Sequence, residues 1–303
     1  MDKARPAFEP GGKLHAFRSV YDGFDTFLFT PRETSKSGVH IHDNMDSKRT
    51  MIIVIVALLP CLLFGMYNCG YQHWLACGAT EFPFWDLFFY GLLAILPAIV
   101  VSYFVGLGIE FCVAQWRGEE IQEGFLVTGI LIPMICPVET PLWMIAVATA
   151  FSVIFVKEVF GGTGYNIFNV ALVTRAFLFF SYPAKMSGDN VFISHDSILG
   201  LGGMAPDGFT GATPLGQVAT SGAQNAADVA ASLQGVDGHA IDLWQMFLGL
   251  IPGSFAETST LCILIGAALL LVTGIASWRI ILSVFAGGAV MSLIAHWCAT
   301  PTY

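Results

Sequence analysis

One glycine-rich segment carries the side chains best suited to chemistry. It runs Asp207-Gly208-Phe209-Thr210-Gly211-Ala212-Thr213 and offers one carboxylate and two hydroxyl groups among small neighbours. A glycine-rich run that contains an aspartate is also typical of an ordinary turn capped by the aspartate. Taken alone, the segment therefore predicts a turn, and any chemistry depends on the rest of the chain.

A second candidate is an acidic residue at the end of a long apolar run. Glu110 follows Val105-Gly106-Leu107-Gly108-Ile109. A carboxylate inside a membrane span is costly and usually marks an ion path. Near Arg117, however, it could lie at the headgroup level, where it costs little. Gly106 and Gly108 are most simply explained by close helix packing, for which small residues are common.

Two amides and one arginine form a third group. Asn166 and Asn169 are three residues apart, so a helix that begins nearby would place them on one face. They also suit the cap of a helix that follows Gly164. Arg175 lies further along the same apolar run and needs a partner there, such as a phosphate or a helix-end carbonyl.

The elements that position these residues are membrane helices. The chain is 55% hydrophobic and 12% charged, whereas soluble domains carry about 25% charged residues. The composition favours lipid as the solvent and gives no reason to expect nucleic acid as a partner. We predict an all-α, polytopic fold in which the first span ends in a turn at residues 67–70. The expected apolar segments are Met51–Met66, Phe84–Cys112, Phe125–Cys136, Leu142–Val156, Ile167–Phe180, Trp244–Ile251, Thr260–Ser277 and Ile280–Trp297.

Two of these segments, Phe125–Cys136 and Trp244–Ile251, are short and bounded by proline or glycine. Paired interrupted segments indicate an inverted-repeat helical bundle with half-helices and a site near the middle of the membrane. The predicted organisation has four parts. These are an N-terminal segment (1–50), a first membrane repeat (51–182), an outer-face loop with the glycine-rich segment (183–243) and a partial second repeat (244–303).

The distribution of basic residues predicts the orientation. Eight of the thirteen Lys and Arg precede residue 50, which places the N-terminus in the cytoplasm. If Phe125–Cys136 crosses the membrane, the loop after Phe180 faces outward. That loop has one Lys and six Asp between residues 181 and 242, as expected for an outer face. His195, His239 and His296 lack ligand spacing, so we expect them to be structural or surface residues.

Several motifs together resemble the NqrB/RnfD family of membrane electron-transfer subunits. The glycine-rich segment matches the family's flavinylation pattern, Asp-Gly-x-Ser/Thr-Gly-Ala-Thr. The likeness extends over nearly the whole chain and is stronger to the NqrB branch, which has a longer N-terminal segment. The other matching stretches begin at Phe8, Gly65, Glu123, Lys157, Arg175, Ile251 and Gly274, and include Lys157-Glu158-Val159-Phe160-Gly161-Gly162-Thr163-Gly164 and Gly274-Ile275-Ala276-Ser277-Trp278-Arg279.

The resemblance implies a covalent cofactor. In the family, a flavin transferase moves FMN from FAD onto the last threonine of the motif as a phosphoester. Here that residue is Thr213, and Asp207 is the motif aspartate that the transferase recognises. The redox chemistry belongs to the cofactor, while the protein positions and tunes it. The implied function is electron transfer from NADH, through partner subunits of a six-subunit complex in the bacterial inner membrane, to ubiquinone, coupled to export of sodium ions.

The resemblance also gives roles to the other candidates. Asn166, Asn169 and Arg175 match the surroundings of a non-covalent riboflavin. Gly106 and Gly108 match a helix near the quinone site. Glu110 matches an acidic residue of the sodium path.

There are two departures from the family pattern. Val170 stands where the family has proline, which predicts a regular start for the helix there. The family's chain continues with further spans, whereas this sequence ends at Tyr303, which suggests a C-terminally truncated chain. Two alternatives stay open: an RnfD-like subunit that works with ferredoxin, and an inverted-repeat channel or transporter without flavin.

Overall fold

The computed structural model describes residues 21, 38, 47–118, 124–187, 192–205, 211–221, 228 and 232–298. These residues form helices joined by loops, and their only β pairings are two isolated bridges, Ile198–Leu201 and Gln234–Ala240. Three of the helices, Arg49–Ala76, Phe84–Arg117 and Trp278–Cys298, are long and apolar enough to cross a membrane. The predicted all-α, polytopic fold is confirmed, and most of the predicted N-terminal segment lies outside the described residues.

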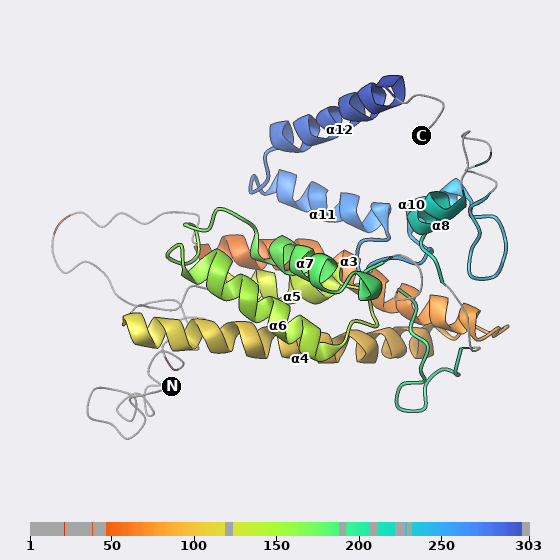
Figure 1. Cartoon of the computed structure of the whole chain (residues 1–303), viewed down its shortest axis with the longest axis horizontal. Helices are drawn as coiled ribbons and strands as arrows, with labels where there is room; N and C mark the ends of the chain where they lie inside the picture. Colours follow the sequence, from red (N-terminus) through yellow and green to blue (C-terminus); the bar gives the residue numbers. More distant parts are fainter. Residues whose placement is uncertain are drawn as a thin grey trace.

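The helices follow one another along the chain in an order that Figure 1 displays from red to blue. Their bounds are α3 (Ser47–Ala76), α4 (Phe84–Arg117), α5 (Phe125–Ile135), α6 (Leu142–Ser152), the π-helical η2 (Val153–Glu158), α7 (Val170–Ser181), the short 3-10 helix η3 (Pro183–Lys185), α8 (Pro214–Ser221), α10 (Leu243–Leu248), α11 (Thr260–Val272) and α12 (Trp278–Cys298).

Helix α3 does not end at residues 67–70, so the predicted turn there is wrong. The side chain of Asn68 donates to the Ile251 carbonyl oxygen at 3.0 Å, so a distant segment satisfies this buried amide. Gly70 lies inside the helix, and this position is a glycine because a Cβ there would overlap the Leu87 backbone of α4. Tertiary contacts therefore explain the polar and glycine residues that suggested a turn.

The first interrupted segment, Phe125–Cys136, meets the chain that follows the second one, Trp244–Ile251, inside the molecule. Helix α5 contains Pro133 and ends at Ile135, and the Ala256 backbone N–H donates to the Met134 carbonyl oxygen at 3.1 Å. Phe255 and Ala256, which precede α11, are buried in the core cluster that also contains Met134. Irregular backbone at membrane depth is tolerated where the protein itself covers it. The internal repeat inferred from these segments stays a prediction.

The bundle of α3 to α7 has two ends, which lie at the two sides of Figure 1. At the N-terminal end, which holds the start of α3 and the loop 159–169, the Arg117 side chain donates to the Glu158 carbonyl oxygen at 2.6 Å. At the long-loop end, which holds residues 77–83, 192–205 and α8, the Tyr90 hydroxyl donates to the Asp196 carbonyl oxygen at 2.6 Å. Helix α5 starts at the N-terminal end, and α7 runs from the N-terminal end toward the long-loop end.

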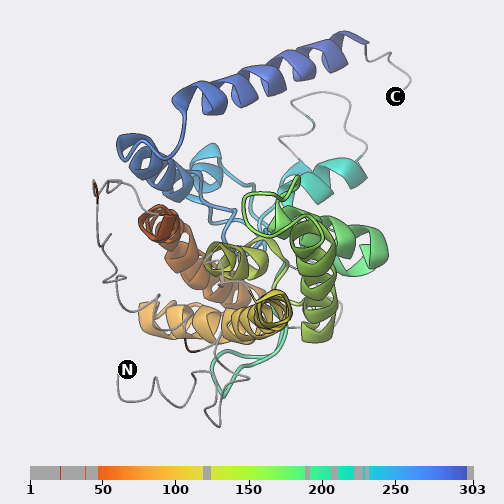
Figure 2. The same ribbon diagram turned by 90° about the vertical axis from the view of Figure 1, so that its left-hand side faces the viewer.

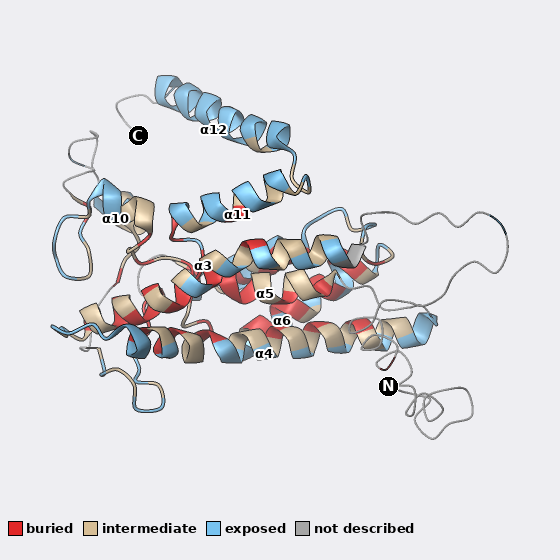
Figure 3. Ribbon diagram, turned by 180° about the vertical axis from the view of Figure 1, so that it is seen from behind, coloured by how far each residue is buried: buried red, intermediate tan, exposed pale blue. Residues whose placement is uncertain are grey.

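Helices α11 and α12 differ in their packing. Helix α11 lies against α3, where a Cβ on Gly266 would overlap the Ala57 carbonyl oxygen. Helix α12 has no buried residue, and the views in Figures 1 and 2 place it apart from the bundle. Figure 3 confirms that burial is concentrated between α3, α4, α5 and α6, while α12 is exposed along its length.

Candidate functional site

Thr213 lies directly before helix α8 and caps it. The backbone N–H of Gly216 donates to Thr213 Oγ1 at 3.2 Å, and the N–H of Gln217 donates to the Thr213 carbonyl oxygen at 2.9 Å. This is the geometry of an N-cap threonine, whose side chain satisfies a free N–H of the first turn. The residue is half-buried, and its hydroxyl stands at the positive end of a short helix.

The segment that leads to Thr213 is seated on the protein by a glycine contact. A Cβ on Gly211 would overlap the side chain of Ile193, which is itself fully buried. The side chain of Gln217 donates to the Ala212 carbonyl oxygen at 2.9 Å and to the Gln234 carbonyl oxygen at 2.7 Å. Position 211 is a glycine because the Ile193 side chain packs directly against it. This contact and the hydrogen bonds of Gln217 fix the position of Thr213. Asp207 and Thr210 lie outside the described residues.

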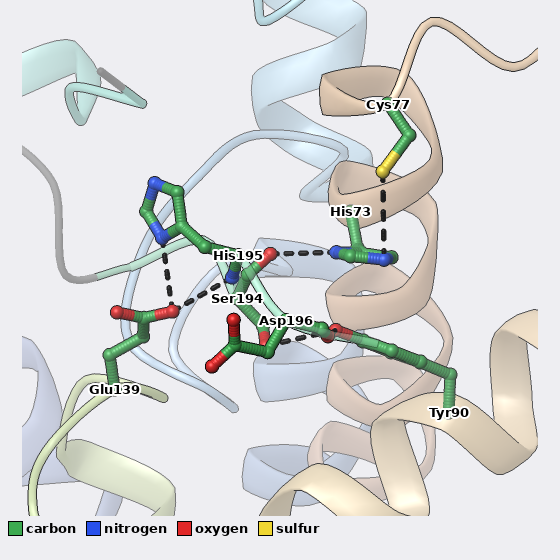
Figure 4. Close-up of polar contacts among 7 residues, drawn as sticks. All are labelled: His73, Cys77, Tyr90, Glu139, Ser194, His195 and Asp196. Carbon is green, nitrogen blue, oxygen red and sulfur yellow. Dashed lines mark hydrogen bonds and ion pairs between the residues drawn. The ribbon is translucent and has the colours of Figure 1, made fainter. Parts of the chain in front are cut away.

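A cluster at the long-loop end holds residues 194–196, which directly follow Ile193 (Figure 4). The His73 Nδ1 hydrogen-bonds to the Ser194 carbonyl oxygen at 2.7 Å, so this nitrogen is the protonated donor. The Tyr90 hydroxyl lies 2.9 Å from Ser194 Oγ, and its ring stacks on the His73 ring with centroids 4.3 Å apart. Helices α3 and α4 thus hold residues 194–196 from beneath.

The same cluster includes a contact from the loop after α5. Glu139 Oε1 accepts from the His195 backbone N–H at 2.7 Å and lies 3.0 Å from His195 Nδ1. On the other side, Cys77 Sγ lies 3.6 Å from His73 Nε2, and burial raises the pKa of the Cys77 thiol. The thiol therefore stays neutral and can donate to the histidine. Through Glu139, His195 joins the loop 192–205 to the loop after α5.

Glu110 is at the N-terminal end, where it is buried rather than exposed near Arg117. Its carboxylate forms an ion pair with Lys157 of η2, and the side chains of Lys157 and Glu110 are 6% and 5% exposed. The Lys157 Nζ also lies 6.0 Å from the centroid of the Phe125 ring. A buried charge needs such a partner, so Lys157 accounts for the presence of Glu110 in this helix.

The two glycines beside Glu110 have different surroundings. Gly106 is buried, and a Cβ there would overlap the Phe125 ring, so its role in this structure is close packing of α4 and α5. Gly108 is not fully buried and has nothing within 4 Å of a Cβ position. Of the two glycines, Gly108 is therefore the one that presents an open surface to a ligand or a lipid.

The expected helix from Ile167 starts later, because α7 begins at Val170. Asn166 and Asn169 therefore do not share a helix face. Asn169 caps α7 by accepting from the Leu172 backbone N–H at 3.2 Å. Asn166 is used within its own loop, since its Nδ2 donates to the Phe168 carbonyl oxygen at 2.8 Å and its Oδ1 accepts from the Gly164 N–H at 3.2 Å. The capping interpretation therefore applies to Asn169, whose Nδ2 has no hydrogen-bond partner within the described part of the chain.

Arg175 finds a carboxylate as its partner, not a helix-end carbonyl. Its guanidinium lies 2.8 Å from Glu257 Oε2, with side chains 37% and 46% exposed. This pair joins α7 to the irregular segment before α11. It therefore lies away from Asn166 and from the cap at Asn169, which precede the first turn of α7.

The structure therefore does not bring the predicted site residues together at one site. Thr213 is at the long-loop end, and Glu110, Gly106 and Asn169 are toward the N-terminal end. Sequence reasoning did not identify His73, Glu139 or Lys157 as partners. The only available signal for Lys157 was a charge at the end of an apolar run, and nothing in the sequence pairs it with a residue 47 positions earlier.

Comparisons with known proteins identify the family of this chain. The model of the NQR2, RnfD, RnfE family matches residues 34–303. The chain is 41% identical to the B subunit of a Na(+)-translocating NADH-quinone reductase from Chromohalobacter salexigens, over 97% of this chain and 71% of that protein. The proteins of the same name from Azotobacter vinelandii and Pseudomonas aeruginosa are each 39% identical, over 100% and 97% of this chain and 75% and 73% of theirs. The chain therefore belongs to the NQR2, RnfD, RnfE family.

Proposed function

We propose that this chain is the membrane-embedded B subunit of a sodium-translocating NADH–quinone reductase. The observation that carries the proposal is the identity of 41% to a protein of that name over 97% of this chain. The three named relatives favour this function over an RnfD-like subunit that works with ferredoxin. The proposal places the chain in the bacterial inner membrane, where it receives electrons from NADH through the other subunits of the complex and passes them toward ubiquinone, coupled to export of sodium ions.

Within that function, Thr213 is the attachment point for FMN. Its half-buried hydroxyl precedes α8, and Gly216 N–H lies 3.2 Å from Oγ1. A phosphoester at this position would lie at a helix N-terminus, which favours an anion. The close contact of Gly211 with Ile193 gives the segment before Thr213 a fixed position on the protein. These features fit the attached group, which supplies one- and two-electron chemistry when bound.

The remaining residues support the same function. Asn169 has a free amide donor for the polar edge of a riboflavin, while Asn166 shapes the loop and Arg175 holds the segment before α11. Gly108 leaves an open surface on α4 for a quinone ring, and Gly106 packs against Phe125. Glu110 lies on the path of the sodium ion, paired with Lys157.

Covalent flavin on Thr213 is tested by co-expressing the chain with a flavin transferase and viewing a denaturing gel for fluorescence. The parent chain should give a fluorescent band because a phosphoester survives denaturation. Thr213→Ala should give a dark band, and so should Thr213→Asn, because asparagine keeps the helix cap but has no hydroxyl. Thr213→Ser should retain fluorescence.

Thr220→Ala is the matched control. Thr220 is on the same helix, and its hydroxyl bonds only to the Gly216 and Gln217 carbonyl oxygens among the contacts described, so fluorescence should persist. A fluorescent Thr213→Asn band would move the attachment to another residue. A dark parent band with an active transferase would contradict the flavin function and favour the channel or transporter.

A further inference from the structure

The Glu110–Lys157 pair is more deeply buried than the other lysine or arginine ion pairs among the described residues. Its side chains are 5% and 6% exposed, whereas those of Arg117 and Glu158 are 31% and 12% exposed. Both partners lie in helices that pack against each other, and Lys157 Nζ is near the Phe125 ring. The carboxylate is therefore neutralised entirely from within the chain.

Lys157 is carried by a distorted helical turn. Helix α6 continues as the π-helix η2, in which the Val159 N–H bonds to the Ile154 carbonyl oxygen at 3.0 Å. Single π-helical turns inside α-helices are frequent at functional sites. The buried residues of this turn are Val153, Val156 and Lys157. The Lys157 ammonium is therefore the one polar side-chain group among the buried residues of the turn.

Three buried hydroxyl groups lie on the same helix faces as the pair. Ser102 is on α4, Thr149 and Ser152 are on α6, and none has a hydrogen-bond partner in the described part of the chain. Ser102, Gly106 and Glu110 are buried at four-residue intervals, so Ser102 is about 12 Å from Glu110 along the helix. Buried hydroxyls without partners are costly, and as neutral oxygens they suit a cation.

We propose that Lys157 is a tethered competitor for the sodium ion at Glu110. A sodium ion and an ammonium group on one buried carboxylate would leave a net positive charge in a low-dielectric site, which is unfavourable. A sodium ion that binds Glu110 therefore has to displace the Lys157 ammonium. The four-carbon stem of lysine permits this movement, and the Ser102, Thr149 and Ser152 hydroxyls offer oxygen ligands beyond the pair. This inference rests on the proposed function.

The test is the sodium dependence of NADH–quinone turnover in the purified whole complex. It is measured at alkaline pH so that protons do not replace lysine as the competitor. Lys157→Met should lower the half-saturating sodium concentration by roughly fivefold or more, the lower range of coupling between two ligands. Lys157→Arg should raise that concentration, because a guanidinium binds a carboxylate in a bidentate manner and is harder to displace. Each complex is also checked for covalent flavin.

Arg117→Met is the matched control, since Arg117 also pairs with an acidic residue at the same end, and it should leave the half-saturating sodium concentration unchanged. An unchanged value in both Lys157 variants would overturn the competitor role and leave Lys157 as a structural counter-ion. If Lys157→Met does not assemble, the Lys157→Arg value alone decides between these outcomes. A parent complex without sodium dependence would instead refute the proposed function.

Discussion

The two ends of the α3–α7 bundle handle polar groups in opposite ways. The N-terminal end buries two full charges, Glu110 and Lys157, against each other. The long-loop end uses hydrogen bonds of His73 and Tyr90 to hold a half-exposed loop, and Glu139 contacts His195 of this loop. A buried carboxylate needs a counter-charge. A half-exposed loop can be held in position by hydrogen bonds alone.

The N-terminal end and the long-loop end of the bundle are expected to lie on opposite sides of the membrane, and thiol labelling can test this. Thr220 is exposed on α8 at the long-loop end, and Tyr165 is 73% exposed in the loop 159–169. In chains without other reactive cysteines, Thr220→Cys should be labelled by an impermeant thiol reagent in intact cells, and Tyr165→Cys only after lysis. Labelling of Tyr165→Cys alone would reverse the orientation, and labelling of both would contradict the two-sided arrangement.

Removing one partner of the buried pair should have the largest energetic effect. Glu110→Ala leaves the Lys157 ammonium uncompensated, and breaking a buried pair costs about 3–5 kcal/mol. The yield of assembled complex and its Tm should fall, and the double variant Glu110→Ala, Lys157→Met should recover them without sodium dependence. Glu257→Ala breaks the exposed pair with Arg175 and should cost at most about 1 kcal/mol. Equal losses in the two single variants would refute the distinction.

The two glycines of α4 give a matched pair with opposite outcomes. Gly106→Ala forces the Phe125 ring to move, and overpacking of this kind costs about 1–3 kcal/mol. Gly108→Ala meets nothing within 4 Å and should leave the Tm unchanged or slightly higher, because alanine favours helix. If Gly108 lines the quinone surface, its variant should raise the KM for quinone alone. A stable Gly106→Ala complex would show that α4 and α5 are loosely packed.

At the long-loop end, the expected effect of one lost anchor is smaller. Tyr90→Phe removes the hydroxyl that bonds to Ser194 and Asp196, and a hydrogen bond contributes about 0.5–1.5 kcal/mol. The fraction of chain with covalent flavin should decrease without reaching zero, as measured by in-gel fluorescence per protein. Tyr165→Phe, an exposed tyrosine at the other end, is the control. Full flavin content in Tyr90→Phe would separate this cluster from the attachment of FMN.

The smallest effect is expected from the amide at the start of α7. Asn169→Asp keeps the helix cap but replaces the free Nδ2 donor with an oxygen. The non-covalent flavin released on denaturation should decrease, while the covalent flavin on Thr213 is unchanged. Replacing both Asn166 and Asn169 with Leu should lose the non-covalent flavin completely. Unchanged riboflavin in both variants would leave these residues with structural roles only.

Hydropathy was sufficient to predict the all-α fold and most of the helices, because lipid-exposed helices carry their signal in composition alone. It failed where a polar residue is satisfied by a distant partner. Asn68 suggested a turn, but its amide bonds to Ile251, 183 positions away. Lys157 suggested the end of a span, although it lies inside the protein against Glu110. A family motif was sufficient to predict Thr213 as a site residue. The packing of the neighbouring Gly211 on Ile193 could be seen only in the structure.

The π-helical turn η2 sets the rotational phase of α6. The buried positions Ile145, Thr149, Val153 and Lys157 recur every four residues, which in a regular α-helix of 3.6 residues per turn would drift by about 40° at each step. The wider turn counteracts this drift and brings Lys157 back toward Glu110. With one residue fewer, such as the exposed Ile154, a regular α-helix would place Lys157 eleven residues after Ile145, which is about three full turns. The π-helical turn therefore accommodates one extra residue, and a deletion of Ile154 should keep the charge on the face toward Glu110.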